Sequence, residues 1–250
     1  MNNNSANADT GRYLGKLTWV EAEHFLRKKP VVVIPFAAGA KEHGPHLPMQ
    51  TDQLVMEHLL DAAVAERHVL VVPPVLHGWF PAFEEFPGTF VDSNVFQSYL
   101  FSIAQSLVNQ GVEKIVFLNL GIAKATGLPL SVVARDLRAT PGVQTLVVSW
   151  DDLETIEANE WSEQERGGHA DEMETSIILY LARDQVQMDK AKKDYRGTKQ
   201  NQIGYAPGKF EKGELGVFGD PTLATADKGE KMFDLMRKNW LLALQQFAQR

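Results

Sequence analysis

Short apolar runs alternate along the chain with longer stretches in which apolar residues recur every three or four positions. The short runs predict buried strands at residues 31–36, 69–73, 114–119 and 143–150. The longer stretches predict amphipathic helices at residues 52–66, 93–109, 128–137, 171–182 and 228–249. Strands that alternate with helices are typical of a mostly parallel sheet whose right-handed crossovers place helices on both faces. We therefore expect a three-layer α/β/α fold.

Two stretches lack a regular period. Residues 151–168 are acidic and polar and end in Gly167 and Gly168, which predicts a loop at the rim of a site. Residues 190–219 are also irregular. Neither an internal repeat nor a shift in composition marks a second domain, so we expect a flexible N-terminal segment at residues 1–12 and one domain at residues 13–250.

The composition narrows the class of protein. Hydrophobic residues make up 44% of the 250 residues and charged residues 23%, as in globular proteins. The net charge of −7 argues against non-specific nucleic-acid binding. The absence of cysteine excludes disulfides, thiolate nucleophiles and cysteine-type zinc sites. Without a signal peptide or a transmembrane-length apolar run, the expected location is cytoplasmic, with no membrane partner.

Candidate chemistry is concentrated directly after the predicted strand at residues 31–36. Two imidazoles and two carboxylates fall within eleven residues, from Glu42 and His43 through His46 to Asp52. Parallel α/β sheets bind ligands outside the carboxyl ends of their strands. Divalent metals in turn favour imidazole nitrogens and carboxylate oxygens that converge from different directions. The pattern therefore predicts a site at this end of the sheet.

Several motifs resemble those of the creatininase (creatinine amidohydrolase) family. Residues 43–48 and 51–52 match its E-Q-H-G-P-H-L-P-x-x-T-D signature, and residues 86–89 match F-P-G-T. Residues 169–176 resemble H-A-G-E-x-E-T-S, and residues 219–229 resemble G-D-P-x-x-A-T-x-x-K-G. The resemblance implies a creatininase-like fold and a metal-dependent hydrolase acting on a C–N bond of a cyclic or small linear amide. It also implies a homo-oligomer, commonly a hexamer.

Three polar positions of the family are changed in this chain. Lys41 stands where the family has a glutamate metal ligand, and Glu42 is shifted next to His43. Gly121 stands where the family's N-G-H-G-G-N block supplies a histidine ligand. Residues 80–83 replace the S-x-E-H block that precedes F-P-G-T. We therefore expect one ion per chain instead of two, and creatinine itself is not the expected substrate.

The resemblance points to His43, Asp52 and Glu174 as ligands of a single zinc or manganese ion. Three protein ligands with an open fourth position are typical of a catalytic zinc site. Such an ion would polarise the carbonyl and activate water. His169 would then move protons to the leaving nitrogen. Asp52 has an alternative interpretation as the N-cap of the helix that follows it.

Two interpretations of Lys41 stay open. Its ammonium would supply fixed positive charge where relatives place a metal ion, or it would act in catalysis by proton transfer. Alternatively, an insertion within residues 37–40 displaces Lys41 to the surface, and Glu42 turns inward as a metal ligand. Neighbouring residues point to opposite faces of a regular strand, but a loop does not impose this rule.

Three further residues are candidate substrate contacts, each with a structural alternative. His46 would orient another ligand or form part of a turn. Glu172 would contact the substrate or face water as a first-turn acid. Trp79 would form an apolar wall with Phe80 and Phe83, or belong to the core or to a subunit contact.

Two other functional classes compete with the metal-dependent hydrolase. The first is a degenerate family member that binds a small molecule or uses Lys41 and His169 for acid–base chemistry without metal. The second is a structural or assembly protein. The retention of His43, Asp52, His169 and Glu174 without an obvious packing need favours the hydrolase.

Overall fold

The structure is a computed structural model that describes residues 10–121, 123–154, 160–195 and 215–250. Within this part of the chain a five-stranded parallel sheet has the order β1-β3-β2-β4-β5. Its strands are β1 (Arg12–Tyr13), β2 (Val31–Ala37), β3 (Val69–Val71), β4 (Lys114–Leu120) and β5 (Gln144–Ser149). The predicted parallel sheet is confirmed.

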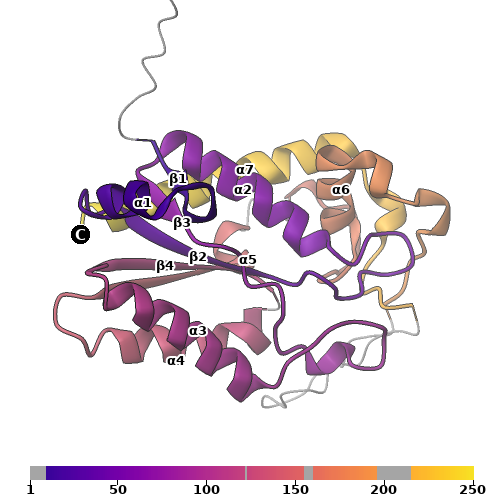
Figure 1. The fold of residues 1–250 in the computed structure, drawn as a ribbon. Coiled ribbons are helices and arrows are strands. Elements are labelled where there is room, and N and C mark those ends of the chain that lie inside the picture. The colour runs from indigo at the N-terminus through magenta and orange to yellow at the C-terminus, as the bar shows by residue number, and fades with distance from the viewer. Residues whose placement is uncertain (1–9, 122, 155–159, 196–214) are drawn as a thin grey trace, which may run out of the picture.

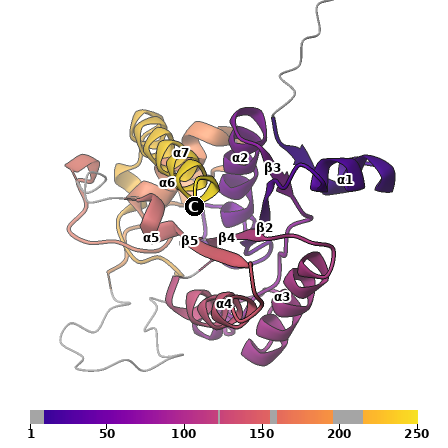
Figure 2. The same cartoon turned by 90° about the vertical axis from the view of Figure 1, so that its left-hand side faces the viewer.

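Helices cover both faces of this sheet, as Figures 1 and 2 show. One layer holds α2 (Thr51–Glu66), α6 (Glu172–Leu181) and α7 (Ala226–Ala248), and the other holds α3 (Ser93–Val108) and α4 (Ala123–Leu137). Two further helices are short, α1 (Trp19–Leu26) and α5 (Trp150–Leu153). Five 3₁₀ turns complete the described elements: Leu14–Lys16, Pro81–Phe83, Arg183–Gln185, Met188–Lys190 and Pro221–Leu223. The three-layer α/β/α architecture is confirmed.

The central strand β2 is buried along its whole length. Because successive side chains point to opposite faces, Val31 and Val33 join the core beneath α2, α6 and α7. Val32, Ile34 and Phe36 join the core beneath α3 and α4. A continuous apolar run is what a strand covered on both faces requires. Burial on both faces fixes the position at which β2 ends and its loop begins.

The strand order reverses beside β2. The chain runs from β2 through α2 to β3 on one side, then crosses through α3 to β4 on the other side. The carboxyl ends of β2 and β4 lie side by side there, with Phe36 paired to Asn119. Such a switch point is where α/β sheets bind ligands. The loop that follows β2 carries Lys41, Glu42 and His43.

Some element boundaries differ from the sequence predictions. Helix α4 begins at Ala123 instead of residue 128, because Pro129 lies inside the helix and does not start it. Strand β1 and helix α1 were not predicted. Arg12 pairs with Leu70, so the sheet begins inside the segment predicted to be flexible, of which residues 1–9 lie outside the described part.

The two irregular stretches are described only in part, because residues 155–159 and 196–214 lie outside the described residues. Residues 151–153 of the first stretch belong to α5, where a loop was predicted. In residues 160–168 the backbone N–H groups of Glu163 and Gln164 donate to Glu172 of α6. In the second stretch Val217 and Phe218 are buried. Among the helices described, none combines the length and the apolar character needed to cross a membrane.

Candidate metal and catalytic site

Lys41 lies inside the protein, although its charge favours solvent. Only 3% of the residue is exposed. Its Nζ lies 2.9 Å from Oδ2 of Asp52. The ammonium also lies 5.5 and 5.3 Å from the ring centroids of Phe80 and Phe83, within cation–π range. The alternative of a displaced surface lysine is therefore wrong.

Asp52 lies in the first turn of α2 and contacts both Lys41 and His43. Its Oδ1 lies 2.8 Å from Nε2 of His43, and its Oδ2 faces Lys41. Burial raises the pKa of the Asp52 carboxyl, but the positive charges of Lys41 and His43 outweigh burial and hold this pKa well below its usual range. The N-cap of α2 is Gln50, so the capping alternative for Asp52 is wrong.

Both ring nitrogens of His43 face oxygen atoms. Nδ1 lies 2.9 Å from the backbone oxygen of Lys41, and Nε2 faces Asp52. Carbonyl and carboxylate oxygens only accept hydrogen bonds. Both contacts are thus hydrogen bonds only when the ring carries a proton on each nitrogen, and a bound cation would have to replace one of these protons.

His169 and Glu42 form a second buried pair. His169 lies on a short antiparallel bridge with Phe218, which fixes its backbone. Its Nε2 lies 3.0 Å from Oε1 of Glu42, whose Oε2 accepts from the N–H of Gly44. Burial raises the pKa of the Glu42 carboxyl, but the hydrogen bond and charge of His169 bring the pKa below its usual value. Glu42 therefore also points inward.

Helix α6 presents Glu174 to the same region. Asp171 caps the helix by accepting from the backbone N–H of Glu174 at 3.0 Å. The Glu174 Oε2 accepts from the N–H of Ala170 at 2.6 Å and lies 3.8 Å from Nδ1 of His169. Burial, then the negative charges of Asp171 and Asp52, raise the pKa of the Glu174 carboxyl well above its usual value. A nearby cation would stabilise the ionised form of this carboxyl group.

Six residues therefore meet at the switch point, and we call them the polar cluster: Lys41, Glu42, His43, Asp52, His169 and Glu174. Within it, one potential ligand atom from each of His43, His169 and Glu174 lies within 4.8 Å of the others. The converging set differs from the predicted one, because His169 stands in it and Asp52 does not.

His46 lies beside the polar cluster and contacts α6. Its Nε2 lies 2.8 Å from Oγ1 of Thr175, while its buried Nδ1 has no hydrogen-bond partner among the described residues. Burial, then the charges of His43 and His169, lower the pKa of His46 to about 4. Thr175 was not singled out from the sequence, although it belongs to the matched block at residues 169–176.

Glu172 is buried in a different set of contacts. Its carboxylate accepts from Lys228 Nζ at 2.5 Å, Ser162 Oγ at 3.1 Å and the N–H groups of Glu163 and Gln164. These partners come from the loop before α6 and from α7. Glu172 thus does not face water, and its observed contacts are structural. The substrate contact predicted for it has no support in these contacts.

Aromatic side chains border the polar cluster on one side. The ring centroid of Phe83 lies 4.7 Å from that of His169, and Phe80 stacks against Phe36 with centroids 6.0 Å apart. Trp79, the predicted substrate contact, is partly buried. The rings that reach the polar cluster are those of its neighbours Phe80 and Phe83.

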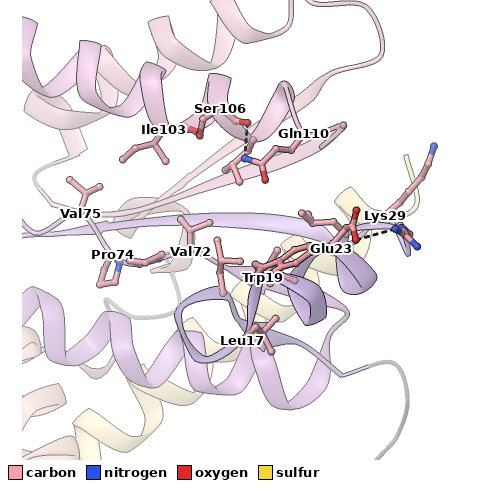
Figure 3. A pocket seen from close by; sticks show the side chains of 18 of the residues that line it. Leu17, Trp19, Glu23, Lys29, Val72, Pro74, Val75, Ile103, Ser106 and Gln110 are labelled. Atoms are coloured by element: carbon pink, nitrogen blue, oxygen red, sulfur yellow. Dashed lines mark hydrogen bonds and ion pairs between the residues drawn. The ribbon is translucent and has the colours of Figure 1, made fainter.

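A separate groove of about 1090 Å³ lies between α1 and α3 (Figure 3). Apolar side chains such as Trp19, Val72 and Ile103 line it, with polar groups such as Glu23 and Gln110 at its sides. None of the six residues of the polar cluster belongs to its lining. The candidate chemistry therefore lies outside this groove.

The parallel sheet and the histidine and carboxylate groups at its switch point define the general class, an α/β protein with a candidate metal site. The sequence profile of the family described as Creatininase: Creatinine amidohydrolase matches residues 15–244. The chain belongs to the creatininase family.

Individual relatives agree with this assignment. The mycofactocin precursor peptide peptidase of Mycolicibacterium smegmatis is 28% identical over 218 residues, covering 82% of this chain and 80% of the relative. The peptidase of the same name from Mycobacterium tuberculosis (strain CDC 1551 / Oshkosh) is 25% identical over 248 residues, covering 89% of this chain and 88% of the relative.

Solved structures show the same fold. A creatininase mutant of the Zn–Zn type superposes with a TM-score of 0.79 at 21% identity, covering 94% of this chain and 98% of that one. A manganese creatininase gives a TM-score of 0.79 at 22% identity with the same coverage.

Proposed function

We propose that this protein hydrolyses an amide C–N bond with one divalent ion held by His43, His169 and Glu174. The observation that carries the proposal is the convergence of these three side chains within 4.8 Å. Two imidazoles and one carboxylate, with a fourth position open, form a donor set typical of catalytic zinc. When bound, such an ion supplies Lewis-acid polarisation of the scissile carbonyl.

Lys41 gives the proposed site a second, fixed positive charge. Asp52 holds its ammonium at 2.9 Å, and the rings of Phe80 and Phe83 shield the ammonium from water. A fixed cation in such an environment stabilises the negative charge that develops on the substrate oxygen. With His169 among the ligands, we assign to Lys41 the transfer of a proton to the leaving nitrogen, and the proton released by the attacking water restores the ammonium.

The proposed substrate is a small cyclic amide or a peptide bond. Support comes from relatives named as precursor peptide peptidases and from solved neighbours named as creatininases, one of them complexed with creatine. The creatininase S-x-E-H block is absent, so creatinine itself is not proposed. The apolar residues Phe80 and Phe83 favour a substrate with one uncharged face.

The hydrolase proposal is tested by incubating zinc- or manganese-loaded protein with cyclic amides and short peptides and detecting new amine and carboxylate products by mass spectrometry. We expect turnover that falls at least about 100-fold in Lys41→Met, as when one electrostatic group is removed from an active site. Lys29→Met, at an exposed ion pair, should keep full turnover. Equal turnover in Lys41→Met and the parent would contradict the assigned role.

A second function is favoured by one specific observation. Both oxygens of Asp52 and both ring nitrogens of His43 already have partners within the chain. The site would then bind a small molecule, or perform acid–base chemistry with Lys41 and His169, without metal. Turnover or ligand binding that persists after exhaustive chelation would favour this function over the hydrolase with one ion.

The ion and the assembly state are also part of the proposal. We propose one zinc or manganese ion per chain, and a homo-oligomer on the basis of family resemblance. Light scattering coupled to gel filtration measures the assembly state directly. A monomer across the micromolar range would contradict the proposed oligomer without affecting the proposed chemistry.

A further inference from the structure

His169 Nε2 faces two oxygen atoms of the same residue. The backbone oxygen and Oε1 of Glu42 each lie 3.0 Å from this nitrogen. Neither oxygen carries a proton to donate, so Nε2 must be the donor. In the neutral ring the other nitrogen, Nδ1, then keeps its lone pair. That nitrogen lies 3.8 Å from Oε2 of Glu174. Glu174 belongs, with His43 and His169, to the set whose potential ligand atoms lie within 4.8 Å of one another.

Glu42 is itself held tightly. Its Oε2 accepts from the N–H of Gly44 at 2.8 Å, and the residue is only 8% exposed. Gly216 packs against the same carboxylate, since a Cβ at this position would lie 2.1 Å from Oε2. Gly216 also has a positive φ of 66°, which favours glycine. Both oxygens of Glu42 are thus committed to protein contacts, which disfavours the ligand role that the sequence suggested.

We propose that Glu42 is a positioning residue that fixes the tautomer and the orientation of His169. It holds the proton on Nε2 and directs the Nδ1 lone pair toward Glu174. This inference rests on the proposed function, because the orientation of His169 matters if Nδ1 binds the ion. A carboxylate behind a ligating histidine typically contributes 10- to 100-fold in metal affinity.

The tautomer is tested first on metal-free protein. Long-range ¹H–¹⁵N correlation spectra separate a ring nitrogen that bears hydrogen from one that bears a lone pair, and His169→Asn identifies the His169 signals. At a pH where this ring is neutral, we expect the Nε2–H tautomer. An Nδ1–H tautomer would overturn the proposal. Because no metal is present, this outcome does not depend on the proposed hydrolase function.

The second test measures zinc affinity by calorimetry in Glu42→Leu and Glu42→Gln. We expect a loss of about 10- to 100-fold in Glu42→Leu with unchanged stoichiometry. The loss should be smaller in Glu42→Gln, because its amide oxygen still accepts from Nε2. Glu42→Gln also keeps the test valid if Glu42→Leu fails to fold. Glu165→Leu, which removes an exposed glutamate near His169 in sequence, is the matched control and should leave affinity unchanged.

Cobalt substitution separates positioning from ligation. The ligand-field bands of the cobalt protein should be the same in Glu42→Gln and in the parent, because the coordinating atoms are the same. Changed bands at a cobalt concentration that saturates both proteins would show that Glu42 is a ligand and would overturn the proposal. If the parent itself binds no metal, the proposed hydrolase fails, while the tautomer measurement still decides the role of Glu42.

Discussion

Lys41 and Asp52 are both almost inaccessible to solvent, and their charged atoms stand 2.9 Å apart. Moving either charge out of water costs several kcal/mol, which is offset only while the partner remains. His43 adds a second donor to the same carboxylate. At the scale of single residues, the buried ammonium and the buried carboxylate therefore stabilise each other.

Replacing Lys41 with methionine should destabilise the fold by about 3–5 kcal/mol, because it leaves Asp52 as a buried charge without its ion-pair partner. Urea unfolding followed by circular dichroism measures the change. Lys29→Met is the control, since its pair with Glu113 is exposed and should contribute less than about 1 kcal/mol. Equal losses in the two variants would contradict the buried pair.

His46 predicts a pH dependence of stability. Its pKa is lowered from 6.5 to about 4 in the folded state, so the unfolded chain binds more protons between these values. The contribution of His46 to the free energy of unfolding is fully present above pH 6.5. It falls by up to about 1.4 kcal/mol per pH unit as the pH decreases toward 4. Urea unfolding at pH 7, 6 and 5 should show a shallower decline in His46→Gln than in the parent. Parallel declines would contradict this assignment.

Helix α7 packs tightly against α6 at Gly229. A Cβ at this position would lie 1.9 Å from the backbone oxygen of Ser176. Thr225 caps α7, and its own N–H donates to Ser176 Oγ at 3.1 Å. At the scale of elements, the matched block at residues 219–229 therefore docks α7 against α6, where it supports the helix that carries Glu174.

Gly229→Ala should cost at least about 2 kcal/mol, since the added methyl group meets backbone and not a mobile side chain. Gly127→Ala in α4 is the matched control, because its nearest atom would be Asn119 Nδ2 at 3.8 Å. That substitution should be neutral or stabilising by up to about 1 kcal/mol. Thermal and urea unfolding measure both variants, and a neutral Gly229→Ala would contradict the described helix contact.

Long elements were predictable, and short ones were not. The strands β2 and β4 and the helices α2, α3, α6 and α7 match their predicted ranges closely. Helix α1 has only eight residues, of which one, Phe25, is buried. Strand β1 has two residues, too few for any period. Pro129 concealed the start of α4, since proline usually marks a first turn.

At the scale of the whole molecule, the sequence predicted that the six residues of the polar cluster lie in one region, but not how they pair. The loop after β2 allows Lys41 and Glu42 to point inward together, which no strand-like alternation predicts. The pairing of Glu172 with Lys228 depends on how α7 docks against α6. Likewise, His169 joins the converging set because its bridge to Phe218 orients it. Such contacts follow from tertiary structure and not from spacing along the chain.

The central claim is that His43, His169 and Glu174 hold one divalent ion per chain. Elemental analysis of protein loaded with zinc or manganese and then desalted tests it most directly. We predict one ion per chain in the parent and in Glu165→Leu, and none in His43→Ala or Glu174→Gln. No ion in the folded parent, or two ions per chain, would contradict the account.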